Sequence, residues 1–398
     1  MRVAFLTHEP YDPPSGGGSS EAPYLIREFV SRGHEVHLFC PQFSNMDSVR
    51  LRDGMRLHPF DSWSMGRYTR WRTLKYAAYP FALEQKLRSW LRQHPDSGVF
   101  AQHSISGVTA HRVASLARGP VVLNYLDQLT GFIEGWEPGA FWRPVARALQ
   151  RWECGLAAGA GVDGVLAVSD ELLRRLEPVV GPNVATMTLR FGMDSARFPY
   201  RQPRESPGPV VVMHGSMDRH HLGPILAGAM RIVAKRRPGT VFRFIGRRTP
   251  SLARVLEQAS GSGIAAVHTP FCPYDRIGEE IGQATIGMIP YEDTAGGRCA
   301  FVAKAVEYAA VGLPWVSTRL AGIADYFQGE RSVRLTDFDP EGFAEAILGL
   351  IAEAPRGDLV DDAAALSRRV HSDLAWESLA RRAVDFFEGI GVRNHPNM

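Results

Sequence analysis

The sequence has few cysteines and no long apolar run, and each lack argues against a class of protein. Its four cysteines, Cys40, Cys154, Cys272 and Cys299, lie far apart among 398 residues and form no CxxC or Cys/His ligand spacing. This usage is typical of reduced thiols in a cytosolic protein. No window approaches the roughly 18 uninterrupted apolar residues of a membrane-spanning helix. The apolar stretch in MRVAFLTHEP is only about four residues long and predicts a strand rather than a signal peptide.

The chain also lacks a strong charge bias and the common phosphate-binding fingerprints. Its net charge is +3 at pH 7 and no Lys/Arg run occurs, so a nucleic-acid partner is not expected. No GxGxxG follows the first expected strand, and no GxxxxGK[ST] is present. These absences argue against a dinucleotide-binding dehydrogenase and against a P-loop enzyme.

Strand-like and helix-like runs alternate along the chain, which is typical of parallel α/β sheets. In the first half, we expect a helix over 22–32 and strands over 3–6, 35–40, 99–102, 121–125 and 164–168. In the second half, we expect strands over 210–214, 241–245 and 267–269, and helices over 222–236, 251–259 and 277–283. Residues 201–209 hold three prolines and predict a linker. The pattern therefore predicts two doubly wound Rossmann-like domains, 1–200 and 210–398, which face each other across a ligand-binding cleft.

Residues 301–318, FVAKAVEYAAVGLPWVST, carry the most informative motif. They predict a helix over 301–311 followed by a strand over 315–318. Lys304 and Glu307 lie one turn apart near the start of this helix, on the same face. A lysine beside a helix N-terminus can hold phosphate, and a carboxylate can accept two sugar hydroxyl protons, which suits a nucleoside diphosphate. The alternative is an exposed i,i+3 ion pair.

The motifs resemble the two-domain nucleotide-sugar glycosyltransferases of the GT-B fold. The resemblance rests on the glycine-rich loop after the first strand, on RGHEV at 32–36 and on AKAVEYAAVGLPWVST at 303–318. A closer resemblance, to the glucuronosyltransferases of xanthan-like exopolysaccharide assembly, rests on GSM at 215–217, FIG at 244–246, PY at 290–291 and Asp127. It implies UDP as the nucleotide. The donor-binding residues that it implies are Lys304, Glu307, Tyr291, Gly215, Ser216 and Met217.

The chain departs from the retaining members of this family at three positions. Cys299 stands where those enzymes have a second glutamate, and Ser216 and His221 stand where they have an arginine and a lysine. The phosphate charge must then be met by Lys304, by helix N-termini, and by Arg247, Arg248 or Arg298. The resemblance, with these departures, implies transfer with inversion and without a bound metal.

Asp127 follows the apolar run PVVLNYL, at the carboxyl end of an expected first-domain strand. Inverting transfer needs a carboxylate that removes the acceptor hydroxyl proton, and the matching aspartate has that role in the glucuronosyltransferases that this stretch resembles. An aspartate that caps the next helix is the open alternative. His103 and Glu9 are the reserve candidates for the base. Further candidates for the cleft or acceptor side are His8, Gly16, Gly17 and Gly18. The alternative for His103 is a polar residue whose hydrogen bonds are satisfied within the protein, and the alternative for the glycines is a flexible loop.

Residues 61–95 are basic and rich in aromatics. Such a helical stretch can lie on an anionic membrane surface, which would bring the site to a lipid-linked acceptor. The alternative is a solvated helix whose aromatics enter the first-domain core. In the one DxD match that follows a strand-like run, Asp337 to Asp339, Pro340 comes next, so Asp339 is expected to be a helix N-cap rather than a metal ligand.

We therefore expect a cytoplasmic enzyme, either free or peripheral at the inner face of the membrane. It would move a sugar from a nucleotide diphosphate to a hydroxyl of a glycan, a lipid-linked molecule or a small molecule, with no cofactor or metal. Two enzymatic alternatives stay open: a retaining transferase of the same fold and a GT-B-like sugar-nucleotide epimerase. A non-catalytic binding module fits less well with two complete α/β halves.

Overall fold

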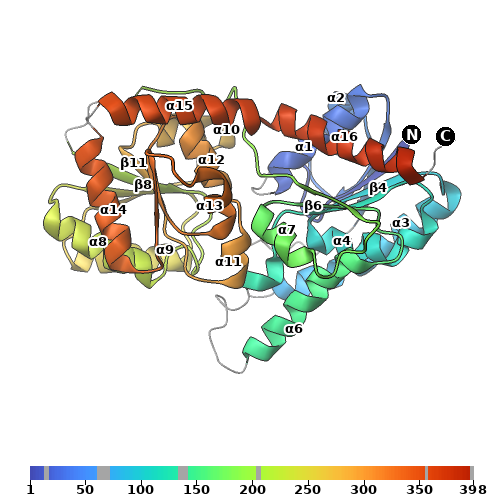
Figure 1. Ribbon diagram of the computed structural model, residues 1–398, viewed down its shortest axis with the longest axis horizontal. Coiled ribbons are helices and arrows are strands. Elements are labelled where there is room, and N and C mark those ends of the chain that lie inside the picture. The colour runs from blue at the N-terminus through green and yellow to red at the C-terminus, as the bar shows by residue number, and fades with distance from the viewer. Residues whose placement is uncertain (13–17, 61–71, 133–141, 203–207, 355–356, 395–398) are drawn as a thin grey trace. The chain divides into compact units, whose positions relative to one another are not determined.

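The computed structural model describes residues 1–398 apart from 13–17, 61–71, 133–141, 203–207, 355–356 and 395–398. The chain divides into two compact units (Figure 1). Unit 1 comprises Met1–Leu129, Arg147–Arg190 and Glu377–Met398, and unit 2 comprises Thr130–Ala146 and Phe191–Trp376.

Unit 1 is built on a seven-stranded parallel sheet in the order β3-β2-β1-β4-β5-β6-β7. Its strands are β1 (Arg2–Leu6), β2 (Glu35–Pro41), β3 (Arg56–Phe60), β4 (Gly98–Gln102), β5 (Val121–Tyr125), β6 (Gly164–Ala167) and β7 (Ala185–Thr188). The helices of this half of the chain are α1 (Gly18–Ser31), α2 (Met46–Asp53), α3 (Arg72–Gln93), α4 (His103–Val113), α6 (Trp142–Gly155) and α7 (Asp170–Leu176). The strand order reverses between β1 and β4, where the carboxyl ends of the strands leave a binding crevice.

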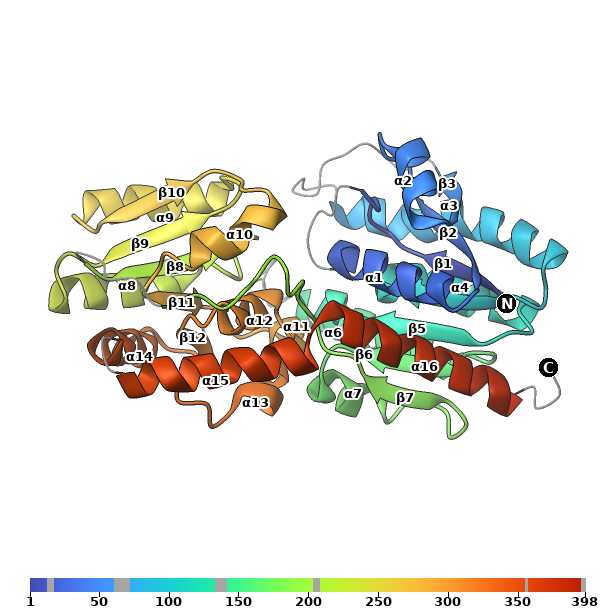
Figure 2. The same ribbon diagram turned by 90° about the horizontal axis from the view of Figure 1, so that it is seen from above.

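Unit 2 holds a six-stranded parallel sheet in the order β10-β9-β8-β11-β12-β13, whose strands lie side by side in Figure 2. Its strands are β8 (Val210–His214), β9 (Val241–Ile245), β10 (Ala266–Thr269), β11 (Ile286–Ile289), β12 (Trp315–Thr318) and β13 (Val333–Thr336). The helices of this half of the chain are α8 (Pro224–Arg236), α9 (Pro250–Gly261), α10 (Tyr274–Ile281), α11 (Ala295–Cys299), α12 (Ala303–Ala310), α13 (Ala321–Phe327), α14 (Pro340–Glu353), α15 (Gly357–Asp373) and α16 (Trp376–Asn394). The order reverses between β8 and β11.

The predicted fold class, two parallel α/β domains, is confirmed. The strands expected at 121–125, 210–214, 241–245 and 315–318 have these bounds in the structure. Asp339 is the N-cap of α14, because its side chain accepts a hydrogen bond from the Gly342 amide at 2.6 Å. The four cysteines are free thiols.

The units divide the chain differently from the predicted boundaries, because α16 belongs to unit 1 rather than to the second half. Phe387 of this helix (red in Figure 1) packs its ring edge-on against Phe29, with ring centroids 5.2 Å apart. Gly98 makes room for it, since a Cβ there would lie 2.5 Å from the Phe387 ring. Arg32 adds ion pairs to Asp385 and Glu388 at 2.6 and 2.7 Å. These contacts place α16 in unit 1, although in the sequence it directly follows α15 of unit 2.

The basic segment 61–95 is described only in part. Residues 61–71 and the side chains of 72–77 lie outside the described residues. Along α3, Tyr79 and Trp90 are buried, whereas Phe81 is 62% exposed. The two buried rings support the expectation of aromatics in the core, and membrane contact through this segment stays a prediction. Within the described part of the chain, no helix is long and apolar enough to cross a membrane.

Replacing the anchor of α16 should destabilise the protein strongly. Because Phe387 is fully buried, Phe387→Ala should lower the free energy of unfolding by about 3–5 kcal/mol. The matched control is Phe81→Ala, which removes an exposed ring and should change it by no more than about 0.5 kcal/mol. Urea denaturation measures both. Equal small effects would mean that α16 is not docked as described.

Candidate functional site

The predicted motif of Lys304 and Glu307 lies in the first turns of α12, in unit 2. Both side chains are buried, with relative exposures of 7% and 4%. This burial excludes the alternative of an exposed ion pair on the helix surface. Buried charged groups carry a desolvation cost, so each must have polar partners.

Lys304 reaches the carboxyl end of β8. Its Nζ donates a hydrogen bond to the Tyr291 hydroxyl at 3.2 Å and lies 5.5 Å from the centre of that ring. Gly215 follows β8 with φ +87°, and a Cβ on it would lie 3.6–3.7 Å from Lys304 Cε and Nζ. The structure thus brings together three of the predicted donor-binding residues, with an ammonium group beside a glycine turn.

Glu307 has a partner that the sequence analysis missed. Its Oε2 lies 2.6 Å from Nε2 of His214, the last residue of β8, and both side chains are buried. Nδ1 of His214 lies 3.2 Å from the hydroxyl of Tyr308. The signal available in the sequence was the position of His214, directly before the GSM turn.

Tyr308 links this pair to the backbone of β8. Burial raises the pKa of Tyr308 well above its usual value, so its hydroxyl keeps a proton, and this hydroxyl lies 3.2 Å from the Val212 carbonyl oxygen. The 2.6 Å distance between His214 Nε2 and Glu307 Oε2 is that of a hydrogen bond to a charged group. Glu307 is therefore held in one orientation by its contact with His214.

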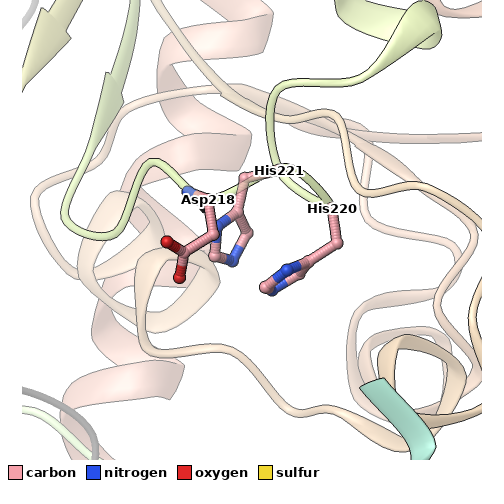
Figure 3. Close-up of side chains that lie close together, drawn as sticks. All are labelled: Asp218, His220 and His221. Carbon is pink, nitrogen blue, oxygen red and sulfur yellow. Dashed lines mark hydrogen bonds between the residues drawn. The ribbon is translucent and has the colours of Figure 1, made fainter. Parts of the chain in front are cut away.

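A histidine cluster follows on the loop after β8. Asp218, His220 and His221 have ligand-type atoms within 4.8 Å of one another, and the His221 ring lies between the other two side chains (Figure 3). Metal-binding histidines usually donate their second ring N–H to an acceptor. Here His221 Nδ1 instead accepts from the Asp218 amide at 3.1 Å, so the proton of the neutral ring sits on Nε2. The neutral His221 ring would therefore present Nε2–H to a ligand, whereas a metal would need that nitrogen without its proton.

The remaining predicted donor residues are less central. The side chain of Met217 lies in the hydrophobic core, so only its backbone remains for a ligand. Arg298 makes two hydrogen bonds of 2.6 Å to Asp293 on the surface. Ser216 is partly buried and Arg247 is exposed. The N-terminus of α8 already has an acceptor within the protein, because Glu292 Oε1 accepts a hydrogen bond from the Ile225 amide.

The acceptor-side candidates lie in unit 1, at the carboxyl ends of β1, β4 and β5. Asp127 is partly buried, two residues beyond β5. His103 begins α4 with φ +69°, and its ring centroid is 4.5 Å from that of His8. Glu9 is buried, and its Oε1 lies 3.9 Å from His8 Nε2. Gly18 begins α1, and residues 16–17 lie outside the described residues. Whether Asp127 is a base or a cap stays a prediction.

Unit 2 also has a cavity of about 990 Å³ at the opposite edge of its sheet. It is lined by the loops that precede the strands, among them Pro209, Pro238 and Pro314. Its described lining includes none of the predicted site residues. The candidate donor site therefore lies elsewhere, at the carboxyl edge of this sheet.

The His214–Glu307 contact makes a stability prediction. His214→Ala would leave the buried Glu307 Oε2 without its hydrogen-bond partner and should lower the free energy of unfolding by about 1–3 kcal/mol. Tyr308→Phe removes one neutral hydrogen-bonding group and should lower it by only about 0.5–1.5 kcal/mol. Denaturant titration of both variants at neutral pH provides the comparison. A small, equal loss in both would mean that the pair is an ordinary neutral hydrogen bond.

Comparisons with known proteins show what this chain is similar to. Residues 16–192 match the model of a glycosyl transferase 4-like domain, and residues 208–353 match that of glycosyl transferases group 1. A curated glycogen synthase of Mycobacterium tuberculosis is 24% identical over 96% of this chain and 92% of its own length.

Solved structures share the fold. The sucrose-phosphate synthase of Thermosynechococcus elongatus has a TM-score of 0.75 at 13% identity and covers 98% of this chain and 99% of its own. Anabaena Alr3699/HepE, solved in complex with UDP, has a TM-score of 0.71 at 14% identity and covers 98% and 100%. The specific closeness to xanthan-like glucuronosyltransferases is not confirmed by these matches. The chain belongs to the group 1 glycosyltransferases of the GT-B fold.

Proposed function

We propose that this enzyme transfers a sugar from a nucleotide diphosphate donor, UDP in the first instance, to a hydroxyl acceptor with inversion and without a metal. The observation that carries the proposal is the buried Lys304 ammonium beside the Gly215 turn, one helical turn from a Glu307 carboxyl fixed by His214. This pairing offers one positive group and one oriented acceptor at the switch point of unit 2.

Lys304 would hold the diphosphate, and its hydrogen bond to Tyr291 keeps the ammonium in place. Glu307 Oε1 would accept the two ribose hydroxyl protons, since Oε2 is engaged by His214. His221 would add a neutral N–H donor toward phosphate oxygens. UDP is supported by the likeness to the Anabaena structure solved with UDP. Because a fixed ammonium offsets the charge that develops on the leaving diphosphate, the donor site needs no metal of its own.

Asp127 would act as the general base in unit 1. Its carboxylate takes the acceptor hydroxyl proton while that oxygen bonds to the anomeric carbon, and the bond from this carbon to the diphosphate oxygen breaks. One displacement of this kind inverts the anomeric centre. A glycan, a lipid-linked molecule or a small molecule could supply the hydroxyl.

Donor binding can be tested by thermal shift against nucleoside diphosphates and nucleotide sugars. A ligand present at about 100 times its dissociation constant should stabilise the protein by about 2.7 kcal/mol. We expect uridine diphosphate to do so. Lys304→Ala removes a charge-assisted contact and should weaken its binding by about 1.5–3 kcal/mol.

The control for this variant is Lys235→Ala, which removes the same charge from the exposed last turn of α8 and should bind normally. Glu307→Ala should weaken UDP more than inorganic diphosphate, which has no ribose. If no uridine, guanosine, thymidine or adenosine diphosphate stabilises the wild type, the donor-site proposal is wrong.

The base can be tested through Asp127→Asn. A general base acts in the transition state, so kcat should fall by about 10²–10⁴-fold while donor affinity stays the same. Asparagine caps a helix nearly as well as aspartate, so a cap would leave turnover and melting temperature almost unchanged. NMR of the product adds a second criterion: a retained anomeric configuration would reject the assignment of Asp127 as base.

A further inference from the structure

A buried carboxyl group in unit 1 has no place in the reaction described so far. Glu21 lies in the first turn of α1 and is only 1% exposed. Its Oε2 accepts from Gln102 Nε2 at 2.7 Å, and both of its oxygens accept from Asn124 Nδ2 at 3.1 Å. The hydrogen-bond partners of this side chain are thus two protein amides, and it can fix the groups around it.

The two side-chain amides that bind Glu21 lie at the carboxyl ends of neighbouring strands. Gln102 on β4 and Asn124 on β5 are register partners in the sheet. Gln102 directly precedes His103, and Asn124 stands three residues before Asp127. The carboxyl group therefore joins the two strand ends from which the acceptor-side candidates leave the sheet.

The backbone at one of these ends needs such support. His103 has φ +69°, a conformation that residues with a Cβ seldom adopt. Such residues persist where surrounding contacts hold them, and they cluster at functional sites. Gln102, whose side chain is held by its hydrogen bond to Glu21, is the residue directly before His103.

The hydrogen-bond pattern also depends on the charge of Glu21. Burial raises its pKa from 4.5 to about 7, although the bonds from Gln102 and Asn124 lower it. The ionised form accepts from both amides. Asn124 Oδ1 has no hydrogen-bond partner among the described residues, so a turned amide could accept from the protonated carboxyl instead. The other ionisable groups at this edge are His8 and Glu9 after β1, His103 on α4 and Asp127 after β5.

We propose that Glu21 is a positioning residue for sugar transfer, whose ionised carboxylate binds Gln102 and Asn124 together and so fixes the strand ends that carry His103 and Asp127. This inference rests on the proposed function. Protonation would loosen the arrangement, so turnover should rise as the pH increases through about 7. Stability should change in the opposite sense. The folded-state pKa is raised, so ionisation of Glu21 in the unfolded chain lowers stability between about pH 4.5 and 7 and no further above it.

The decisive variant is Glu21→Gln, which keeps the shape of the side chain but fixes it in the uncharged form. Its kcat for release of UDP from the active UDP-sugar should be about 10–100-fold lower at pH 8 and should not rise through pH 7. Its affinity for UDP should equal that of the wild type. The melting temperature of the wild type minus that of the variant should fall between pH 5 and 7 and then level.

The control is Leu25→Ala, one turn further along α1, which removes a buried side chain from the same helix and keeps the Glu21 carboxyl and both amides. It should lower the melting temperature yet leave kcat and its pH dependence unchanged. If Leu25→Ala reduces kcat as much as Glu21→Gln, Glu21 contributes stability only. A rise through pH 7 that persists in Glu21→Gln belongs to His8 or His103 and overturns the inference. A wild type that binds no UDP and releases none instead overturns the proposed function.

Discussion

The 2.6 Å contact between His214 Nε2 and Glu307 Oε2 joins the end of β8 to α12 and fixes the candidate site of unit 2. Both groups are buried, so neither can turn to water, and each restricts the other to one orientation. Lys304 lies one turn before Glu307, so its direction follows from the same helix placement. The Gly215 turn passes beside that ammonium with φ +87°, a conformation that glycine adopts without strain.

Unit 1 uses a similar device with different residues. Glu21 from α1 binds side chains on β4 and β5, as Glu307 from α12 binds a side chain on β8. In each unit a helical carboxylate pairs with polar groups at the carboxyl ends of the strands. Parallel strands place all these ends at one edge, where the sheet's own backbone pairing stops. Buried polar pairing there positions loops that would otherwise move.

The sequence predicted the fold well because each expected strand was a short apolar run bounded by turn residues. The structure also brings Lys304, Tyr291 and Gly215 together, since α/β topology fixes which loops share an edge, and their role in donor binding stays a prediction. His214 was missed because it is the last residue of an apolar strand, and pairing across 93 residues leaves no local signal. The return of α16 to unit 1 was missed for a similar reason, because Phe387 fits a space that Gly98 leaves on a strand far away in sequence. Ligand contact at the turn 215–217 stays a prediction, and for Met217 it would run through the backbone because the side chain lies in the hydrophobic core.

His221 stands where the retaining enzymes that the sequence resembles have a lysine, so the proposed donor site has one lysine fewer to meet the phosphate charge. The Asp218 amide donates a hydrogen bond to His221 Nδ1. Arg298 is paired with Asp293, and Arg247 is exposed. Lys304 is a buried lysine at this edge, and in the proposed function neutral N–H donors would have to meet the rest of the diphosphate charge. Neutral donors stabilise an anion strongly only where they are preorganised and water is excluded. The His221 ring packs against Tyr291, with ring centroids 4.4 Å apart, and this contact would hold the ring in one orientation. In the retaining enzymes that the sequence resembles, a flexible lysine stands at this position.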